Sequence, residues 1–155
     1  MYWDEYFLKV CNTVAENSKC HSRQVGAIVV IDNSIISTGY NGPPRGVPDC
    51  KFRDSNSPTG CPRHALGYKS GEGLEWCVAG HAERNALINA ARHGVCVKGA
   101  TMYMNCGIPC KDCLIEIINA GITEIVVTNL EYYDKMSEYL LRTSGLKYRL
   151  YKEIL

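Results

Sequence analysis

The chain has no block of like charge. Its 17 Lys and Arg residues nearly balance its 16 Asp and Glu residues, and the formal net charge is +1. A polynucleotide-binding protein presents a basic patch or stripe, and no run of Lys or Arg occurs here. We therefore expect no polynucleotide partner, although a small phosphorylated ligand would need only one or two cations.

The chain also lacks a long apolar segment near its start. Asp4, Glu5, Lys9 and Glu16 interrupt the first twenty residues, so we expect neither a signal peptide nor a membrane span there, and no membrane partner. No internal repeat or low-complexity tract is visible. A length of 155 residues, with 46% hydrophobic and 21% charged residues, suits one soluble domain with its own core. We expect a single domain over 1–155.

Cysteine, in contrast, is abundant. The nine cysteines are an odd number, and several lie near histidines. Without a secretion signal, this composition favours reduced thiols and metal binding over a disulfide framework. We therefore expect a cytoplasmic protein.

Two short segments carry the chemistry: His81-Ala82-Glu83 and Pro109-Cys110-Lys111-Asp112-Cys113. A hydrolytic zinc site needs three protein ligands and one open position for water. His81, Cys110 and Cys113 can be the ligands, and Glu83 is then free to move protons. Zinc lowers the pKa of a water molecule that it binds to about 7, so such a site can hydrolyse at neutral pH.

Two simpler interpretations of the same residues exist. The cysteines could belong to a closed structural zinc knuckle, or Cys110 and Cys113 could be a redox pair. Neither requires a His-x-Glu segment, and a structural site would need a fourth ligand nearby. The occurrence of both segments, His81-Ala82-Glu83 and Pro109–Cys113, in one chain favours the catalytic interpretation. Cys106 lies near the segment, and we interpret it as a residue that does not bind the metal.

Hydrophobic periodicity and turn residues predict alternating helices and strands. We expect helices over 2–16, 81–93, 110–120 and 133–144, and strands over 25–31, 35–39, 101–105, 124–128 and 147–151. The order predicts an α/β fold of three layers, α/β/α, with a mixed five-stranded sheet. The two parts of the proposed metal site, His81 and the pair Cys110 and Cys113, then both lie at helix N-termini, where the helix dipole stabilises thiolates.

The segment over about 40–80 differs from the rest. It contains five of the six prolines and seven of the fourteen glycines, and it has no apolar periodicity. A loop of this length in a compact domain is functional or disordered. Cys50, Cys61, His64 and Cys77 lie in it, and Cys20 lies in the preceding loop. These residues could hold a second, structural zinc ion in place of a hydrophobic core, or they could be scattered free thiols.

The chain resembles the deoxycytidylate (dCMP) deaminase family, within the cytidine deaminase-like superfamily. The resemblance rests on segments spread over most of the chain: Cys20–Val30, Ser37–Pro43, His81–Leu87, Pro109–Cys113 and Asn119–Val127. The motifs His81-Ala82-Glu83 and Pro109–Cys113 are shared with the wider superfamily, whereas Gly39-Tyr40-Asn41-Gly42 is more specific to the family.

This resemblance implies a zinc-dependent hydrolase of pyrimidine deoxynucleotide metabolism that converts dCMP to dUMP and ammonia. It implies that Asn41 contacts the sugar and that Tyr133 approaches the 5′-phosphate. Arg23 is the nearest cation to that pocket by position. Turn chemistry for Asn41 and a solvated loop position for Arg23 are the simpler alternatives.

The resemblance also implies a second zinc ion, which Cys20, Cys50 and Cys77 would bind. Cys61 is the preferred fourth ligand because the other three are thiols, and His64 is the alternative. A homohexamer and the effectors dCTP and dTTP are further expectations from the family.

One segment departs from the family pattern. Residues 102–109 are one residue longer than is usual before the Pro-Cys pair, so contacts to the base are not carried over there. Two rival functions stay open. One is another deaminase of the superfamily, acting on a tRNA adenosine, a nucleoside or a riboflavin precursor. The other is a non-catalytic, zinc-stabilised binding module, in which Glu83 would be dispensable.

Overall fold

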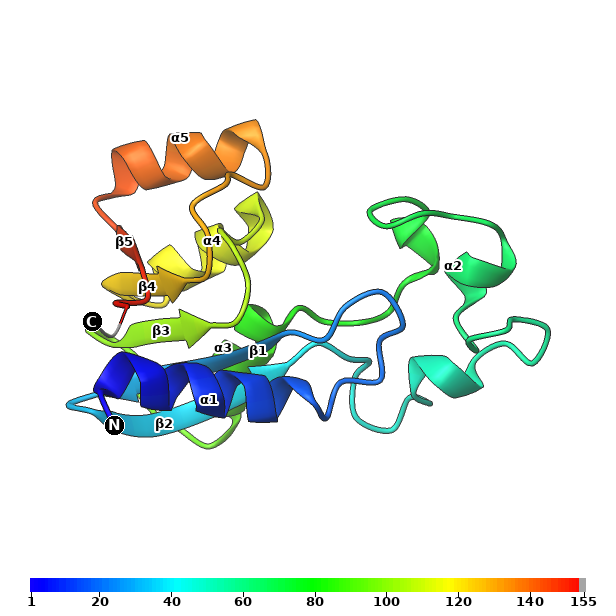
Figure 1. The fold of residues 1–155 in the computed structure, drawn as a ribbon, viewed down its shortest axis with the longest axis horizontal. Coiled ribbons are helices and arrows are strands. Elements are labelled where there is room, and N and C mark those ends of the chain that lie inside the picture. Colours follow the sequence, from blue (N-terminus) through cyan, green and yellow to red (C-terminus); the bar gives the residue numbers. More distant parts are fainter. Residues whose placement is uncertain (154–155) are drawn as a thin grey trace.

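A five-stranded mixed sheet forms the centre of the molecule (Figure 1). The computed structural model describes residues 1–153. The strand order is β2-β1-β3-β4-β5, in which β1 is antiparallel to β2 and to β3, whereas β3, β4 and β5 are parallel. The strands are β1 Gly26–Ile31, β2 Ser34–Tyr40, β3 Thr101–Met104, β4 Glu124–Val127 and β5 Lys147–Leu150.

Helices cover both faces of the sheet, as the alternation of elements predicted. The four long helices are α1 Trp3–Ala15, α3 Ala82–Arg92, α4 Lys111–Asn119 and α5 Lys135–Ser144. One buried cluster lies between α1 and the sheet, and a larger one lies between the sheet and α3, α4 and α5. The expected three-layer α/β/α fold is confirmed. No helix in the described part of the chain is long and apolar enough to span a membrane.

The α1 layer is held by aromatic packing and one ion pair. Phe7 is fully buried, and its ring lies 4.6 Å from that of Tyr103 on β3. Burial of such a side chain stabilises the fold by about 1.5–3 kcal/mol. Asp4 accepts hydrogen bonds from Arg149 at 2.7 and 3.2 Å and from the Lys152 backbone at 2.8 Å, which ties α1 to the last strand.

The sheet brings the functional segments to one edge, namely the edge formed by the ends of its strands. The β1–β2 hairpin turns through Asp32 and Asn33, both with positive φ, as a two-residue hairpin turn requires. In register, Gly26 pairs with Tyr40, and Ala27 pairs with Met104. The start of β1 and the ends of β2, β3 and β4 therefore meet at one edge. The loops that leave this edge lead into α3, α4 and α5.

Residues 43–79 project from this edge as a lobe (Figure 1). Mutual hydrogen bonds between Gly42 and Gly80, at 3.1 and 2.8 Å, close its base. The lobe contains three short helices that periodicity did not predict: η1 Cys50–Phe52, α2 Pro62–Ala65 and η2 Leu74–Trp76. Within residues 43–79, all of which are described, only Cys50, Gly60 and Arg63 are buried.

Candidate active site

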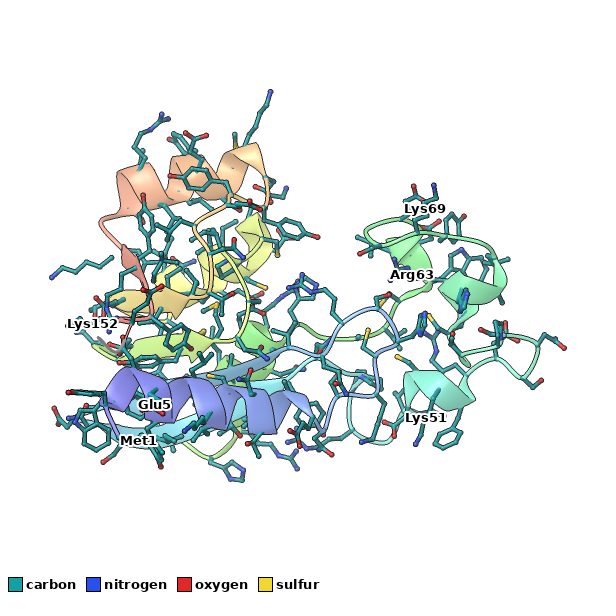
Figure 2. All side chains as sticks on the ribbon, viewed as in Figure 1. Met1, Glu5, Lys51, Arg63, Lys69 and Lys152 are labelled. Atoms are coloured by element: carbon teal, nitrogen blue, oxygen red, sulfur yellow. The ribbon has the colours of Figure 1, made fainter. Side chains whose placement is uncertain are left out.

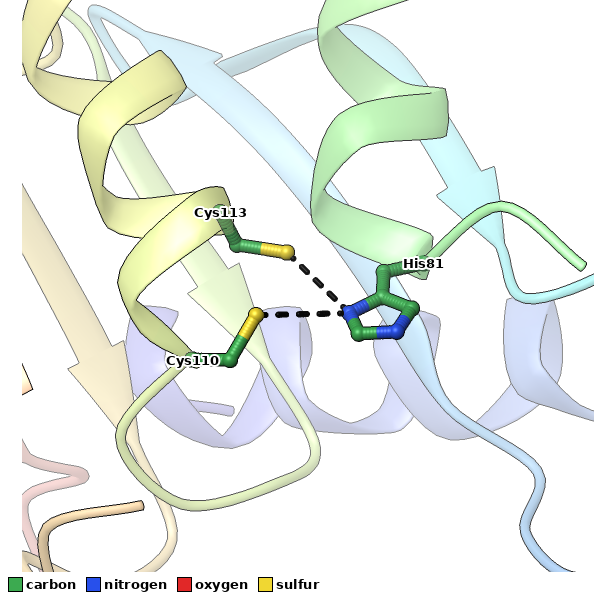
Figure 3. A group of neighbouring side chains, drawn as sticks. All are labelled: His81, Cys110 and Cys113. Carbon is green, nitrogen blue, oxygen red and sulfur yellow. Dashed lines mark hydrogen bonds between the residues drawn. The ribbon is translucent and has the colours of Figure 1, made fainter. Parts of the chain in front are cut away.

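Three donor atoms converge where two helices begin. His81 is the N-cap residue of α3, Cys110 is the N-cap residue of α4, and Cys113 lies in the first turn of α4. The His81 Nδ1 atom lies 3.2 Å from the Cys113 sulfur and 3.6 Å from the Cys110 sulfur (Figure 3). Among residues 1–153, this is the only set of three or more possible metal ligands whose atoms all lie within 4.8 Å of one another.

The two thiols of this group do not ionise alike. Contact with the Cys113 thiol, and then with His81, lowers the pKa of Cys110 to about 4. Contact with Cys110, and then burial, raises the pKa of Cys113 well above its ordinary value. The hydrogen bond between His81 and Cys110 in turn raises the pKa of His81. These contacts favour ionisation of Cys110 over that of Cys113, and a thiolate is the form in which cysteine binds a metal.

The donor set fits zinc. Catalytic zinc sites use three protein ligands of the His and Cys type and leave one position open. Bond lengths of about 2.0–2.3 Å around a tetrahedral ion place neighbouring donor atoms roughly 3.5 Å apart, as the His81 and Cys110 atoms are. A bound ion would replace the proton that holds Cys113 neutral.

Glu83 lies beside His81, Cys110 and Cys113, the three residues of the metal group, and is not one of them. It follows the α3 N-terminus and is buried, and burial raises its pKa above the ordinary value. Its Oε2 atom lies 4.0 Å from the Cys113 sulfur, and its Oε1 atom lies 3.9 Å from the sulfur of Cys106. Cys106 therefore touches the proposed proton carrier. The spacing of Cys106 from the metal ligands in the sequence did not indicate this contact with Glu83.

Arg84, the next residue of α3, was also missed. Its Nε atom is the one buried side-chain nitrogen or oxygen in residues 1–153 that has no hydrogen-bond partner. Although burial opposes its charge, the neighbouring Cys113 sulfur raises the pKa of Arg84. A cation here offsets negative charge on the metal-binding sulfurs. Its position directly after Glu83, at the start of a helix, was the signal that could have found it.

A cavity of about 480 Å³ opens beside this group. His81, Glu83 and Cys110 line it. Arg23, Asn41 and Tyr133, which the sequence proposed for substrate contacts, line the same cavity. The structure thus brings the three to one place, and their contacts to a substrate stay predictions.

The side chain of Asn41 is engaged with its own protein. Its Oδ1 atom accepts from the Val25 backbone at 2.9 Å, and its Nδ2 atom donates to the Arg23 carbonyl at 3.0 Å. Asn41 therefore fixes the loop that carries Arg23, which goes beyond turn chemistry within its own segment.

The N-terminus of α4 is held from α5. Asp134 caps α5 by accepting from the Ser137 backbone at 2.7 Å, and it accepts from the Lys111 backbone at 3.2 Å. Ser137 Oγ donates to the Pro109 carbonyl at 3.0 Å. These bonds fix the two residues that flank Cys110.

The proposed second zinc ligands lie near one another without forming a comparable group. Burial, and after it the neighbouring thiols of Cys20, Cys77 and Cys61, raise the pKa of Cys50. The alternative ligand His64 has its Nδ1 atom 2.9 Å from the Thr59 hydroxyl and stacks on His21, with ring centroids 4.8 Å apart. The second site stays a prediction.

Fold and metal group together define a class, the zinc-binding proteins with the cytidine deaminase fold. The dCMP deaminase of the cyanophage S-TIM5, solved with dCMP and dUMP, superposes with a TM-score of 0.73 at 26% identity over 94% of each chain. The chain belongs to the family described as the cytidine and deoxycytidylate deaminase zinc-binding region, which it matches over residues 1–129.

The relatives of this chain include proteins named deoxycytidylate deaminase. The protein of Mycobacterium phage D29 is 39% identical over 129 residues, which are 80% of this chain and 92% of the relative. The protein of Schizosaccharomyces pombe is 36% identical over 150 residues, which are 96% of this chain and 44% of the relative. The chain thus spans less than half of the fission yeast protein.

Proposed function

We propose that the protein hydrolyses dCMP to dUMP and ammonia with a zinc ion on His81, Cys110 and Cys113. The observation that carries this proposal is the convergence of these three donors beside buried Glu83, at one side of a cavity that arginines also line. The names of the relatives, and the dCMP and dUMP bound to the cyanophage enzyme, support it.

The chemistry divides between the ion and Glu83. A bound zinc ion supplies Lewis acidity that makes water a nucleophile at neutral pH. Glu83 takes one proton from the attacking water and delivers it to the ring nitrogen. It then takes the second proton from the hydroxyl group now on C4 and delivers it to the amine, which leaves C4 as ammonia. Its burial suits this role, because a raised pKa lets the carboxyl hold a proton between the two transfers. Arg84 offsets the charge of the thiolates.

The substrate end of the cavity would recognise a nucleotide. We propose that Asn41 lies against the sugar and that Arg23 and the Tyr133 hydroxyl donate to the phosphate. Arginine forms charge-assisted hydrogen bonds to phosphate.

We also propose that the protein is a single domain with a structural zinc ion on Cys20, Cys50, Cys61 and Cys77. A homo-oligomer, with six copies as in the family, and regulation by dCTP or dTTP are further proposals from the resemblance.

The test is a panel of substrates offered to one zinc-loaded preparation: dCMP, deoxycytidine, cytidine and a tRNA anticodon stem-loop. We expect kcat/KM for dCMP to exceed that of every other substrate. Equal values for dCMP and deoxycytidine would contradict a phosphate pocket. Turnover of the RNA alone would assign the chain to the tRNA deaminases.

A further inference from the structure

We propose that Arg63, from the lobe, is a specificity-determining residue that binds the phosphate of the nucleotide. This inference rests on the proposed function and assigns part of its selectivity to the lobe. From the sequence, only Arg23 and Tyr133 are expected to recognise the phosphate.

Arg63 is a buried cation in a region with almost no buried residues. Its side chain extends from α2 (Figure 2), and the residue is 8% exposed. Its Nε atom donates to the Glu72 carbonyl at 2.7 Å, and its Nη2 atom donates to the Lys69 carbonyl at 2.9 Å. Both acceptors are neutral.

No carboxylate forms an ion pair with Arg63 within the described residues 1–153. Arg63 belongs to none of the three ion pairs found there. The nearby Glu72 side chain accepts from the Lys69 backbone instead, at 3.1 Å. Removing an ion from water without an opposite charge is costly. A buried guanidinium of this kind therefore favours an anionic ligand.

The cavity provides the place for that anion. Arg63 and Ser70 line the cavity from the lobe. Arg23 lines it from the α/β/α part of the chain outside the lobe, which we call the domain. A guanidinium has five N–H donors, and the two carbonyls occupy two of them. The remaining donors can form paired bonds to phosphate oxygens, for which arginine has the matching planar geometry. The carbonyl bonds hold the guanidinium in place before the ligand arrives.

A purely structural role makes a different prediction. If Arg63 only clamps the loop over residues 69–72, its loss should affect every substrate equally. Arg53 is the matched control, because it also clamps a lobe carbonyl. Its Nη1 atom donates to Trp76 O at 2.9 Å, and Arg53 does not line the cavity.

The experiment measures kcat/KM for dCMP and for deoxycytidine with the wild type, Arg63→Gln, Arg63→Lys and Arg53→Gln, all at matched zinc content. Hydrogen bonds to charged groups are worth enough that Arg63→Gln should lower the value for dCMP by at least about tenfold. The value for deoxycytidine should change less than about twofold. Arg53→Gln should leave the ratio of the two values unchanged. Arg63→Lys should retain part of the preference because it keeps the charge.

Calorimetry of dUMP and deoxyuridine binding provides a readout that needs no turnover. Arg63→Gln should weaken dUMP selectively. Equal losses for nucleotide and nucleoside would overturn the inference and leave the proposed function intact. Should Arg63→Gln fail to fold, Arg63→Lys decides, since an unchanged affinity for dUMP relative to deoxyuridine would then overturn it. A wild type that binds dUMP but does not deaminate dCMP would contradict the proposed function instead.

Discussion

The domain and the lobe are stabilised in different ways. The domain buries two apolar clusters against a hydrogen-bonded sheet. The lobe buries no apolar side chain apart from Cys50, and its larger apolar residues are exposed: Val47, Phe52, Leu66, Tyr68, Leu74, Trp76 and Val78. Instead, the lobe has a set of thiols, turns with side-chain-to-backbone hydrogen bonds, and one buried arginine. One part of the chain thus folds by hydrophobic burial, whereas the lobe lacks such burial, and the proposed structural zinc ion would take its place.

The largest expected effect follows from removing the proposed structural zinc site. A structural zinc site contributes folding free energy on the order of 10 kcal/mol, and the lobe has no apolar core to replace it. Cys50→Ser should lower the zinc content from two ions per chain to one. It should also make residues 43–79 sensitive to protease while the thermal transition of the domain changes little.

Cys96→Ser is the control for this change, because Cys96 is exposed and belongs to neither ligand set. It should alter neither the zinc content nor the protease pattern. Wild-type protein with a single zinc ion, whose four lobe-side thiols are all freely alkylated in the folded state, would rule out the second site.

A smaller effect is expected from crowding the domain. A Cβ atom at Gly39 would overlap the backbone of Ala86 and Ala82 in α3. Overpacking of this kind costs about 1–3 kcal/mol. Gly39→Ala should therefore reduce the free energy of unfolding measured in urea.

Gly42→Ala is the matched control from the same four-residue motif. There the added Cβ atom would meet only the Tyr40 ring, at 3.5 Å, which is ordinary contact. Equal stability of the two variants would contradict the close packing of β2 on α3.

The sequence predicted the domain far better than the lobe. The nine predicted helices and strands all occur, with ends shifted by one or two residues, because apolar periodicity records burial against a sheet. Strand order and register depend on contacts between distant segments, so no local pattern reveals them. The short helices of the lobe have too few residues and too little burial to leave a periodic signal.

The site was predicted in the same uneven way. Metal ligands follow from residue type and spacing, and His81, Cys110 and Cys113 do lie together. Arg63 was missed because a buried arginine and a solvated one look alike in a sequence. Arg84 was missed because its approach to the Cys113 sulfur depends on how α3 packs against α4. Asn41 was assigned to the sugar, and the structure shows that it also holds the loop of Arg23.

The smallest expected effect concerns the ion pair between α1 and β5. Burial opposes ionisation of Asp4, but the hydrogen bonds from Arg149 and Lys152 outweigh it, so the pKa of Asp4 lies below its ordinary value. The pair therefore stabilises the fold above the ordinary pKa of an aspartate, and this contribution is lost as pH falls through the lowered pKa.

Asp4→Asn should cost about 1 kcal/mol at pH 7, the upper value for ion pairs that solvent reaches, because the Arg149 side chain is partly exposed. The difference from the wild type should shrink as pH is lowered through the acidic range, as urea unfolding at several pH values would reveal. A difference that does not depend on pH would mean that packing, and not the charge of Asp4, supports α1.

The most direct test of the proposed active site compares dCMP turnover and zinc content in the wild type and in Glu83→Gln. Glu83 touches the metal group without supplying one of its three donors, so the variant should keep its zinc and its stability. Its kcat for conversion of dCMP to dUMP should fall by at least about 100-fold, a typical contribution of general acid–base catalysis. A variant that keeps wild-type turnover, or one that loses its zinc together with activity, would contradict the assignment of Glu83 as the proton carrier beside the metal.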